Sequence, residues 1–385
     1  MTKILKKKGL KPNLLLNNAK PRRNAVEDRE ILKRGAAIPL YIEDIDKDGR
    51  GVSRYSGFKI LVAGAVTGDR CIARISNVGK SFASATVYRF TELSVLRNPC
   101  NPCPDFDTCM GCALLPMRYD EQLRWKHNLV KREFSLFSSL SSAEILEPLF
   151  PSRILGYRTT AKLAIAGSYY EPYIGIYRRS SHDVVDLDGC KIHHPAVNSI
   201  VNLVRRGINK LRIPVWQVEN GTGILRYLVV RVSEKSGEAM VTFVTAKRAF
   251  NEIHHLAKFL QNSMPQVKVI CQNLNNSEGN VIFGASDRFL TKQRTIRDEI
   301  GVVQFEISPR SFLQAQNDGA KLIYEKVAEW SALDGKQTVL DLYCGIGGIA
   351  ITLARQGARV FGVEINRDAV DDARRNARKI GRAHV

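Results

Sequence analysis

Four cysteines lie close together in the segment CNPCPDFDTCMGC, which spans residues 100–112. Thiolates bind zinc and iron–sulfur clusters, and two Cys-x2-Cys pairs can direct four sulfurs at one metal centre. One candidate ligand set is local: Cys100, Cys103, Cys109 and Cys112 as a zinc knuckle, with a short middle gap. An iron–sulfur cluster can instead include a distant thiolate, for which Cys190 in VVDLDGCKIHHP is the candidate. Residue spacing alone leaves both ligand sets open.

A second segment whose residues could bind a ligand is TVLDLYCGIGGIAITLARQGARVFGVEIN, residues 338–366. Its pattern predicts a strand, a glycine-rich turn, a helix and a second strand. Gly345 and Gly347 let the backbone approach a ligand closely, and Gly348 adds no side chain that would crowd it. Asp341 lies at the end of the first strand. Glu364 ends the second, where a carboxylate can accept hydrogen bonds from two ribose hydroxyls.

Two nucleoside cofactors compete for this turn. The spacing Gly345-x-Gly347-x-x-Ala350 fits the dinucleotide fingerprint, so NAD is one candidate. The segment LDLYCGIGG resembles the start of class I methyltransferases, which implies S-adenosylmethionine. We favour the methyl donor, because a dinucleotide domain seldom follows a cysteine cluster and a basic β-rich segment.

Composition indicates the partner. The chain has 385 residues with 58 Lys and Arg against 38 Asp and Glu, a formal net charge of +20. Such an excess favours a polyanion, and nucleic acid before a membrane surface. No apolar run approaches the roughly 18 residues of a membrane helix, and no signal-peptide core is present. We therefore expect a cytoplasmic protein, in which cysteines serve as ligands or core residues rather than disulfides.

The chain divides by pattern into four parts. Residues 1–34 are typical of a basic arm, and residues 35–97 contain short β runs at about ten-residue spacing, which predicts an OB-like barrel. Residues 98–295 predict a central α+β domain that carries the cysteine cluster, and residues 296–385 predict the beginning of a Rossmann-like domain. The expected fold class is thus a multidomain α/β and β protein.

These motifs together resemble a known family. The layout IEDIDKDGRGVSR…VAGAVTGDRCIARI resembles a TRAM domain, an RNA-binding barrel. Cys103, Cys109 and Cys112 with the remote Cys190 resemble the 4Fe–4S site of TRAM-containing bacterial RNA uracil-5-methyltransferases, which leaves Cys100 as a spare residue. The resemblance also includes SPRSFLQ at 308–314 and extends over about residues 36–379. We expect the cluster to brace the fold, because nothing in the chemistry expected of such an enzyme requires redox.

The resemblance also implies a cofactor site and a substrate. Gln314, Tyr343, Gly348 and Glu364 would line the S-adenosylmethionine site, whereas Gln316 stands where the family usually has Asn. The implied substrate is uridine in RNA, with 23S rRNA favoured and tRNA as the alternative, and the implied state is a monomer. The rival function is a non-catalytic RNA-binding iron–sulfur protein.

The implied reaction begins when a cysteine thiolate adds to C6 of uracil, so that C5 can attack the methyl sulfonium. A base then removes the C5 proton and the thiolate leaves. No cysteine follows Cys344, which we assign to packing, and only 48 residues follow Gln337. We therefore expect that the chain is truncated, that its nucleophile and base lie beyond residue 385, and that this fragment is inactive. The terminal IGRAHV also does not continue the preceding helical pattern.

Overall fold

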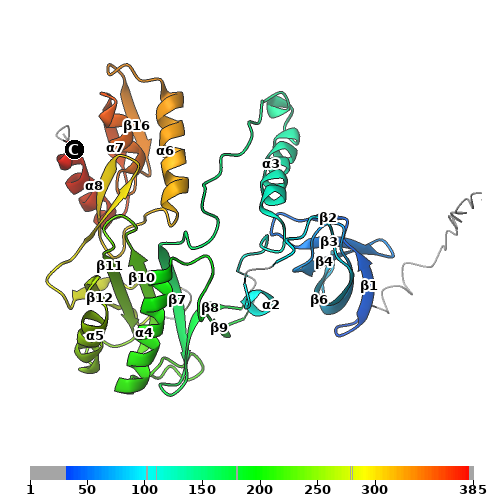
Figure 1. Ribbon diagram of the computed structural model, residues 1–385, viewed down its shortest axis with the longest axis horizontal. Helices are drawn as coiled ribbons and strands as arrows, with labels where there is room; N and C mark the ends of the chain where they lie inside the picture. The colour runs from blue at the N-terminus through cyan, green and yellow to red at the C-terminus, as the bar shows by residue number, and fades with distance from the viewer. Residues whose placement is uncertain are drawn as a thin grey trace, which may run out of the picture. The chain divides into compact units, whose positions relative to one another are not determined.

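The computed structural model describes residues 32–100, 103–109, 111–178, 181–277, 279 and 281–380 (Figure 1). Most of the predicted basic arm, residues 1–31, lies outside the described residues, and so do the last five residues of IGRAHV. The chain forms two compact units that divide after Arg97. No helix within the described ranges is both long and apolar enough to cross a membrane.

The first unit is a six-stranded sheet in the order β1-β5-β6-β4-β3-β2. Adjacent strands are antiparallel except β4 and β6, which are parallel. Side chains alternate between buried and exposed along β1, as expected for a strand with one face on a core. The strands are β1 (Ala37–Tyr41), β2 (Asp44–Ile45), β3 (Gly51–Tyr55), β4 (Phe58–Ala63), β5 (Arg70–Val78) and β6 (Ala83–Glu92).

The predicted closed barrel is not confirmed. The two edge strands β1 and β2 share no ladder, although they are consecutive in the described chain. Only Ile42 and Glu43 separate them, and their amides donate to different strands or turns: Ile42 to Asp69 O at 2.9 Å and Glu43 to Val52 O at 2.8 Å. The backbone hydrogen bonds therefore pass from one part of the sheet to another between Ile42 and Glu43. The two-residue strand β2 pairs only with β3 in the described chain.

The second unit is built on a seven-stranded sheet in the order β13-β12-β11-β10-β7-β8-β9. β11 and β12 are parallel, and the other neighbours are antiparallel. The strands are β7 (Thr160–Gly167), β8 (Pro172–Tyr177), β9 (Val184–Asp186), β10 (Leu225–Val232), β11 (Ala239–Thr245), β12 (Val267–Leu274) and β13 (Ser286–Phe289).

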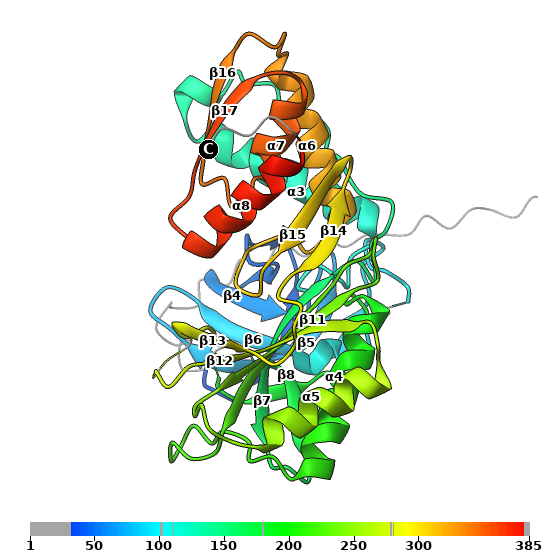
Figure 2. The ribbon, with the colours of Figure 1, turned by 90° about the vertical axis from the view of Figure 1, so that its left-hand side faces the viewer.

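Helices α4 (Pro195–Leu211) and α5 (Glu252–Ser263) pack side by side on one face of this sheet (Figure 2). Apolar residues at helical spacing, such as Ile200 and Val204, form the core with the strands. At Gly207 a Cβ atom would lie 2.4 Å from Leu256 Cδ1, so glycine permits the close approach of the two helices. The opposite face of the sheet is left free of these helices.

The remaining elements flank this sheet in sequence. Before it come α2 (Phe106–Cys109), α3 (Tyr119–Ser135) and the 3-10 turn η1 (Ser138–Leu140). After it come the hairpin β14 (Ile296–Ile300) and β15 (Val303–Ile307), then α6 (Asn317–Ser331), β16 (Thr338–Leu342), α7 (Gly348–Arg355), β17 (Arg359–Val363) and α8 (Arg367–Lys379).

A second core joins the hairpin to the last helices. Phe305 and Ile307 of β15 are fully buried in it, together with Ile351 of α7 and Ala369 of α8. β16 and β17 pair in parallel but leave Leu340, Leu342, Phe361 and Val363 exposed, although parallel sheets ordinarily cover such side chains.

Candidate functional site

The glycine-rich turn follows directly from the pairing of β16 with β17. Leu342 lies opposite Val363, so the residues that follow each strand emerge at the same edge of the sheet. The Cys344 amide donates to Val363 O at 3.0 Å and fixes the turn to β17. Helix α7 then begins at Gly348. This is the carboxyl edge of parallel strands, where open α/β sheets bind ligands.

Three residues of the turn adopt left-handed backbone conformations: Tyr343 has φ 64°, Gly345 φ 57° and Gly347 φ 89°. Glycine takes this conformation freely, whereas Tyr343 is a non-glycine exception whose side chain is 87% exposed. Gly348 is constrained by space instead, because a Cβ atom there would lie 2.2 Å from Tyr324 Oη. The turn therefore presents an open backbone surface next to an exposed aromatic ring.

Two carboxylates stabilise this turn. Glu364 Oε2 accepts a hydrogen bond from the Gly345 amide at 3.0 Å, and its Oε1 accepts one from the Asn366 amide at 2.8 Å. Each carboxylate oxygen can accept a further bond, so Glu364 retains capacity for two ligand hydroxyls. Asp341 Oδ2 accepts from the Ala350 amide at 3.0 Å. Burial raises the Asp341 pKa, and the Ala350 hydrogen bond partly offsets that rise.

Tyr324 and Cys344 lie beside these carboxylates. Burial, and then the charge of Asp341, raise the Tyr324 pKa to about 12, so its hydroxyl is protonated at neutral pH. Burial raises the pKa of the Cys344 thiol, and the charges of Asp341 and Glu364 raise it further. Cys344 Sγ would lie 2.8 Å from a Cβ atom at Gly362, in keeping with the packing role that we assigned to it. It is poorly suited to be a nucleophile.

Gln314 lies in the segment between β15 and α6, and its side chain is exposed. Among the described residues no hydrogen bond joins it to the glycine-rich turn. The next residue, Ala315, accepts from the Thr159 amide at 2.9 Å. Gln316 Nε2 donates to Arg153 O at 3.2 Å, so that side chain is directed toward the backbone at Arg153.

The structure brings Cys190 near Cys103, Cys109 and Cys112. Burial raises the pKa of each of these three thiols, to about 11 for Cys112, and the neighbouring Cys190 raises each one further. Cys100 is exposed, whereas the other three cysteines of the segment are partly buried. The remote cysteine therefore lies beside the clustered thiols, as the iron–sulfur ligand set requires. The choice between the two ligand sets stays a prediction.

The closeness of these four cysteines does not by itself make a metal centre. Within the described residues, no group of three or more Cys, His, Asp or Glu side chains is arranged to hold a metal ion. The four thiols match a cluster in number and donor type, but they do not form a ready-made coordination shell. Two histidines follow Cys190 closely. His194 Nδ1 accepts a hydrogen bond from the Ala196 amide at the start of α4, and His193 is buried.

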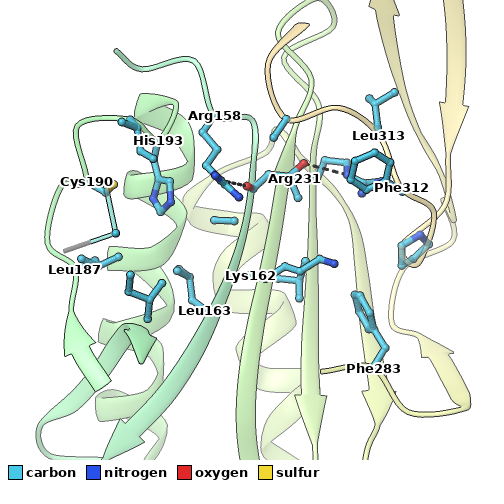
Figure 3. A pocket seen from close by; sticks show the side chains of 18 of the residues that line it. Arg158, Lys162, Leu163, Leu187, Cys190, His193, Arg231, Phe283, Phe312 and Leu313 are labelled. Atoms are coloured by element: carbon cyan, nitrogen blue, oxygen red, sulfur yellow. Dashed lines mark hydrogen bonds between the residues drawn. The ribbon is translucent and has the colours of Figure 1, made fainter. Parts of the chain in front are cut away.

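A cavity of about 400 Å³ adjoins the thiols of Cys109, Cys112 and Cys190. Cys190 is labelled at one side of this cavity in Figure 3. Figure 3 shows Lys162 between Arg231 and Phe283, with Phe312 opposite on the loop before α6. We call this cavity the basic pocket, because its lining includes the cations Arg158, Lys162, Arg231 and Arg310.

Arg231 is the buried member of the basic pocket. Its Nη2 donates to Ser311 O at 2.7 Å and its Nη1 to Ser308 O at 3.2 Å. Burial lowers the Arg231 pKa to about 10, which still leaves the guanidinium charged at neutral pH. Sequence analysis missed this pocket. The available signal was a cation within each apolar strand pattern, Lys162 in TAKLAIAG and Arg231 in LRYLVVRV.

Comparisons with known proteins identify the class to which this chain belongs. An uncharacterized RNA methyltransferase of Geobacter sulfurreducens is 46% identical over 352 residues, which cover 91% of this chain and 71% of the relative. An uncharacterized RNA methyltransferase of Halalkalibacterium halodurans is 34% identical over 348 residues, or 90% of this chain and 76% of the relative. The matches thus define the class as RNA methyltransferases.

The family follows from two further matches. The crystal structure of Pyrococcus abyssi tRNA (uracil-54, C5)-methyltransferase in complex with S-adenosyl-L-homocysteine is similar, with a TM-score of 0.73 and 27% identity over 90% of this chain and 77% of that one. The model of the tRNA (uracil-5-)-methyltransferase family matches residues 118–382. The chain belongs to the tRNA (uracil-5-)-methyltransferase family.

Proposed function

We propose that the protein transfers a methyl group from S-adenosylmethionine to C5 of a uridine in RNA. Family membership supports the reaction type. The observation that carries the cofactor assignment is the Glu364 carboxylate, which is held by the Gly345 amide at the carboxyl edge of two parallel strands. The structure of the similar Pyrococcus enzyme contains S-adenosyl-L-homocysteine.

Each residue of the turn has a definite role in this proposal. Glu364 accepts the ribose hydroxyls, and Gly345, Gly347 and Gly348 leave the backbone accessible to the ligand. Asp341 holds the first turn of α7 through the Ala350 amide, and the exposed Tyr343 ring covers the ligand. The methyl donor supplies an electrophilic carbon. Because the Cys344 thiol has a raised pKa, we propose that a different cysteine forms the adduct at C6.

The first unit is proposed to be the TRAM-type RNA-binding module. Its surface carries cations stacked on exposed aromatic rings: Arg74 lies 4.8 Å from the ring of Tyr88, and Arg70 lies 4.9 Å from the ring of Tyr41. Cations beside aromatic faces suit phosphates and unstacked bases. The net charge of +20 supports the same partner.

Methyl transfer tests the proposal and distinguishes the two RNA substrates. The chain is incubated with labelled S-adenosylmethionine and with unmodified 23S rRNA or tRNA, and the RNA is digested to nucleosides. Labelled 5-methyluridine would support the proposed reaction and would refute our expectation that this chain is inactive. We favour rRNA on the sequence resemblance, although the family model and the Pyrococcus enzyme are both named for tRNA. Binding of S-adenosylhomocysteine, measured by calorimetry, reports on the cofactor site independently of turnover.

Two results would overturn the proposal. One is a methylated product other than 5-methyluridine, because the reaction would then be a different one. The other is failure of the folded chain to bind S-adenosylhomocysteine. Labelling of tRNA without labelling of rRNA would retain the reaction and correct only the preferred substrate.

We further propose a 4Fe–4S cluster held by Cys103, Cys109, Cys112 and Cys190, in which the iron braces the segment around α2 against the sheet. Cys109, Cys112 and Cys190 line one cavity, and Cys190 raises the pKa of each of the other three thiols, which supports the set. Anaerobic purification is expected to yield a brown protein that contains iron and sulfide. Cys190→Ser should abolish the visible absorbance and the bound iron, whereas Cys100→Ser should leave both intact.

The two cysteine variants form a matched pair. A colourless protein with one zinc ion that is lost in Cys100→Ser and retained in Cys190→Ser would refute the iron–sulfur proposal and establish the local knuckle. Measurement of iron, sulfide and zinc in the same samples distinguishes the two metal centres without any assay of methyl transfer.

A further inference from the structure

A second cavity lies on the same two strands as the basic pocket but shares no lining residue with it. This cavity has a volume of about 870 Å³ and is lined by the ends of β7 and β10 and by the loop after α4. None of its lining residues belongs to the glycine-rich turn or to the thiol cluster. We call it the aromatic pocket, because its walls include Tyr173, Tyr177, Trp216 and Tyr227.

Arg226 is the buried cation of the aromatic pocket. It lies at an irregularity in the pairing of β10 with β11, between Leu225 and Tyr227, and a bulge of this kind redirects side chains. Only 7% of Arg226 is exposed, and its guanidinium lies 5.1 Å from the ring of Trp216 and 5.7 Å from the ring of Tyr227. A charge so deeply buried calls for a specific role.

The described residues do not accept hydrogen bonds from every N–H group of the Arg226 guanidinium. Arg226 Nη1 donates to Asn275 O and to Ser277 O, both at 2.8 Å. These are its hydrogen bonds within the described ranges, and Nε is buried without a partner there. An arginine carries five N–H donors, and both of these hydrogen bonds use Nη1. The Nη2 group is therefore the donor that an acceptor in the cavity can use.

The aromatic wall is fixed in place before any ligand binds. The Trp216 amide donates to Leu225 O at 3.0 Å, and the Gln217 amide donates to Thr222 O at 2.7 Å, which closes a tight loop. Gln217 Nε2 donates to Gly167 O at 2.7 Å and ties this loop to the end of β7. A wall that is already ordered loses little entropy when a ring stacks on it.

The electrostatics of the pocket favour a base over a phosphate. Asp183 and Glu219 also line the cavity and are exposed, so they repel a phosphate. A nucleobase is uncharged, stacks on aromatic rings, and offers both acceptors for arginine and amino donors for carboxylates. The chemistry on the walls therefore matches a base better than the sugar–phosphate chain.

The aromatic pocket and the basic pocket lie along the same two strands of the sheet, β7 and β10. Lys162 and Arg231 lie in the basic pocket, and Ala166 and Tyr227 of the same two strands lie in the aromatic pocket. Four residues along a strand span about 13 Å at a rise of roughly 3.3 Å per residue. One strand of RNA can therefore contact both pockets.

We propose that the aromatic pocket binds an unpaired base of the RNA substrate, distinct from the uridine that is methylated. This inference rests on the proposed function in one respect, namely that the substrate is RNA. Stacking against Trp216 and a hydrogen bond from Arg226 hold the base. The pocket thus selects RNA with an unstacked base at a fixed distance from the basic pocket.

Tryptophan fluorescence tests this directly. The chain has three tryptophans, and the double variant W125F/W330F leaves Trp216 as the only emitter. A single-stranded oligoribonucleotide is expected to quench Trp216 saturably, whereas an abasic oligomer of the same length and charge should not. Equal quenching by both oligomers would identify a phosphate site and overturn the inference, as would the absence of any quenching.

Affinity measurements separate this inference from the proposed function. Loss of one base–aromatic stack weakens binding by roughly 5- to 150-fold, so Trp216→Ala should lower RNA affinity within that range. Trp216→Phe should restore most of it, and both variants should bind S-adenosylhomocysteine as the unmodified chain does. If Trp216→Ala binds RNA normally, the inference fails and the proposed function stands. If the unmodified chain binds no RNA, the proposed function itself fails.

Discussion

Glu364→Ala is expected to weaken the binding of S-adenosylhomocysteine by at least about 150-fold. A carboxylate that accepts two ribose hydroxyls makes two charge-assisted hydrogen bonds, each worth about 1.5–3 kcal/mol. The same carboxylate also accepts the Gly345 amide at 3.0 Å, so its removal frees the glycine-rich turn as well. Isothermal titration calorimetry of the variant and the unmodified chain measures the ratio of dissociation constants.

Glu325→Ala is the matched control for this experiment. Glu325 lies on α6 and pairs only at the surface with Lys321, at 3.8 Å. Exposed pairs of this kind contribute about 1 kcal/mol or less, so its loss should leave both folding and ligand affinity nearly unchanged. A folded Glu364→Ala protein whose affinity falls by less than about threefold, a change below 1 kcal/mol, would remove Glu364 from the cofactor site.

Asp372→Ala is expected to lower the free energy of unfolding by about 3 kcal/mol. Asp372 is fully buried on α8 and accepts from the Ser308 amide at 2.8 Å and from Ser308 Oγ at 2.7 Å. It also pairs with Arg375, which is partly exposed and can hydrate after the substitution. The two Ser308 bonds therefore dominate the expected loss, at about 1.5–3 kcal/mol each before the recovered desolvation cost of the carboxylate.

Urea unfolding followed by circular dichroism measures this change. Asp371→Ala is the control, because Asp371 is the adjacent residue of the same type on α8 but is only half-buried. We expect its effect to remain within about 0.5 kcal/mol, as for most surface substitutions. Equal destabilisation by the two variants would show that charge on α8, rather than the contact with Ser308, determines the stability.

The glycine-rich segment was predictable because its signal is local. The sequence pattern predicted a strand, a turn, a helix and a strand, and the structure has β16, the turn, α7 and β17 in that order. Glycines that need positive φ angles and a carboxylate after the second strand are visible in a short window of sequence. The comparisons confirm the tRNA (uracil-5-)-methyltransferase family, which the cysteine spacing and the SPRSFLQ segment indicated most specifically. The TRAM domain and the 4Fe–4S site that the same resemblance implied stay predictions.

Features that depend on distant pairing were not predictable in the same way. The β runs of the first unit were expected, but their strand order and the missing ladder between β1 and β2 depend on long-range partners. Arg226 faces the aromatic pocket because of a bulge that no local pattern indicates. Arg231 was hidden within an apolar strand, and its partners at Ser308 and Ser311 lie 77 and 80 residues away.

The loop between β15 and α6 has one further consequence. Ser308 is held by Asp372 of α8, Ser311 by Arg231 of the sheet, and Ala315 by Thr159 next to β7. Because hydrogen bonds hold this loop at three points, we expect that it does not move as a lid. These contacts tie α8, beside the glycine-rich turn, to the sheet that carries Lys162 and Arg231.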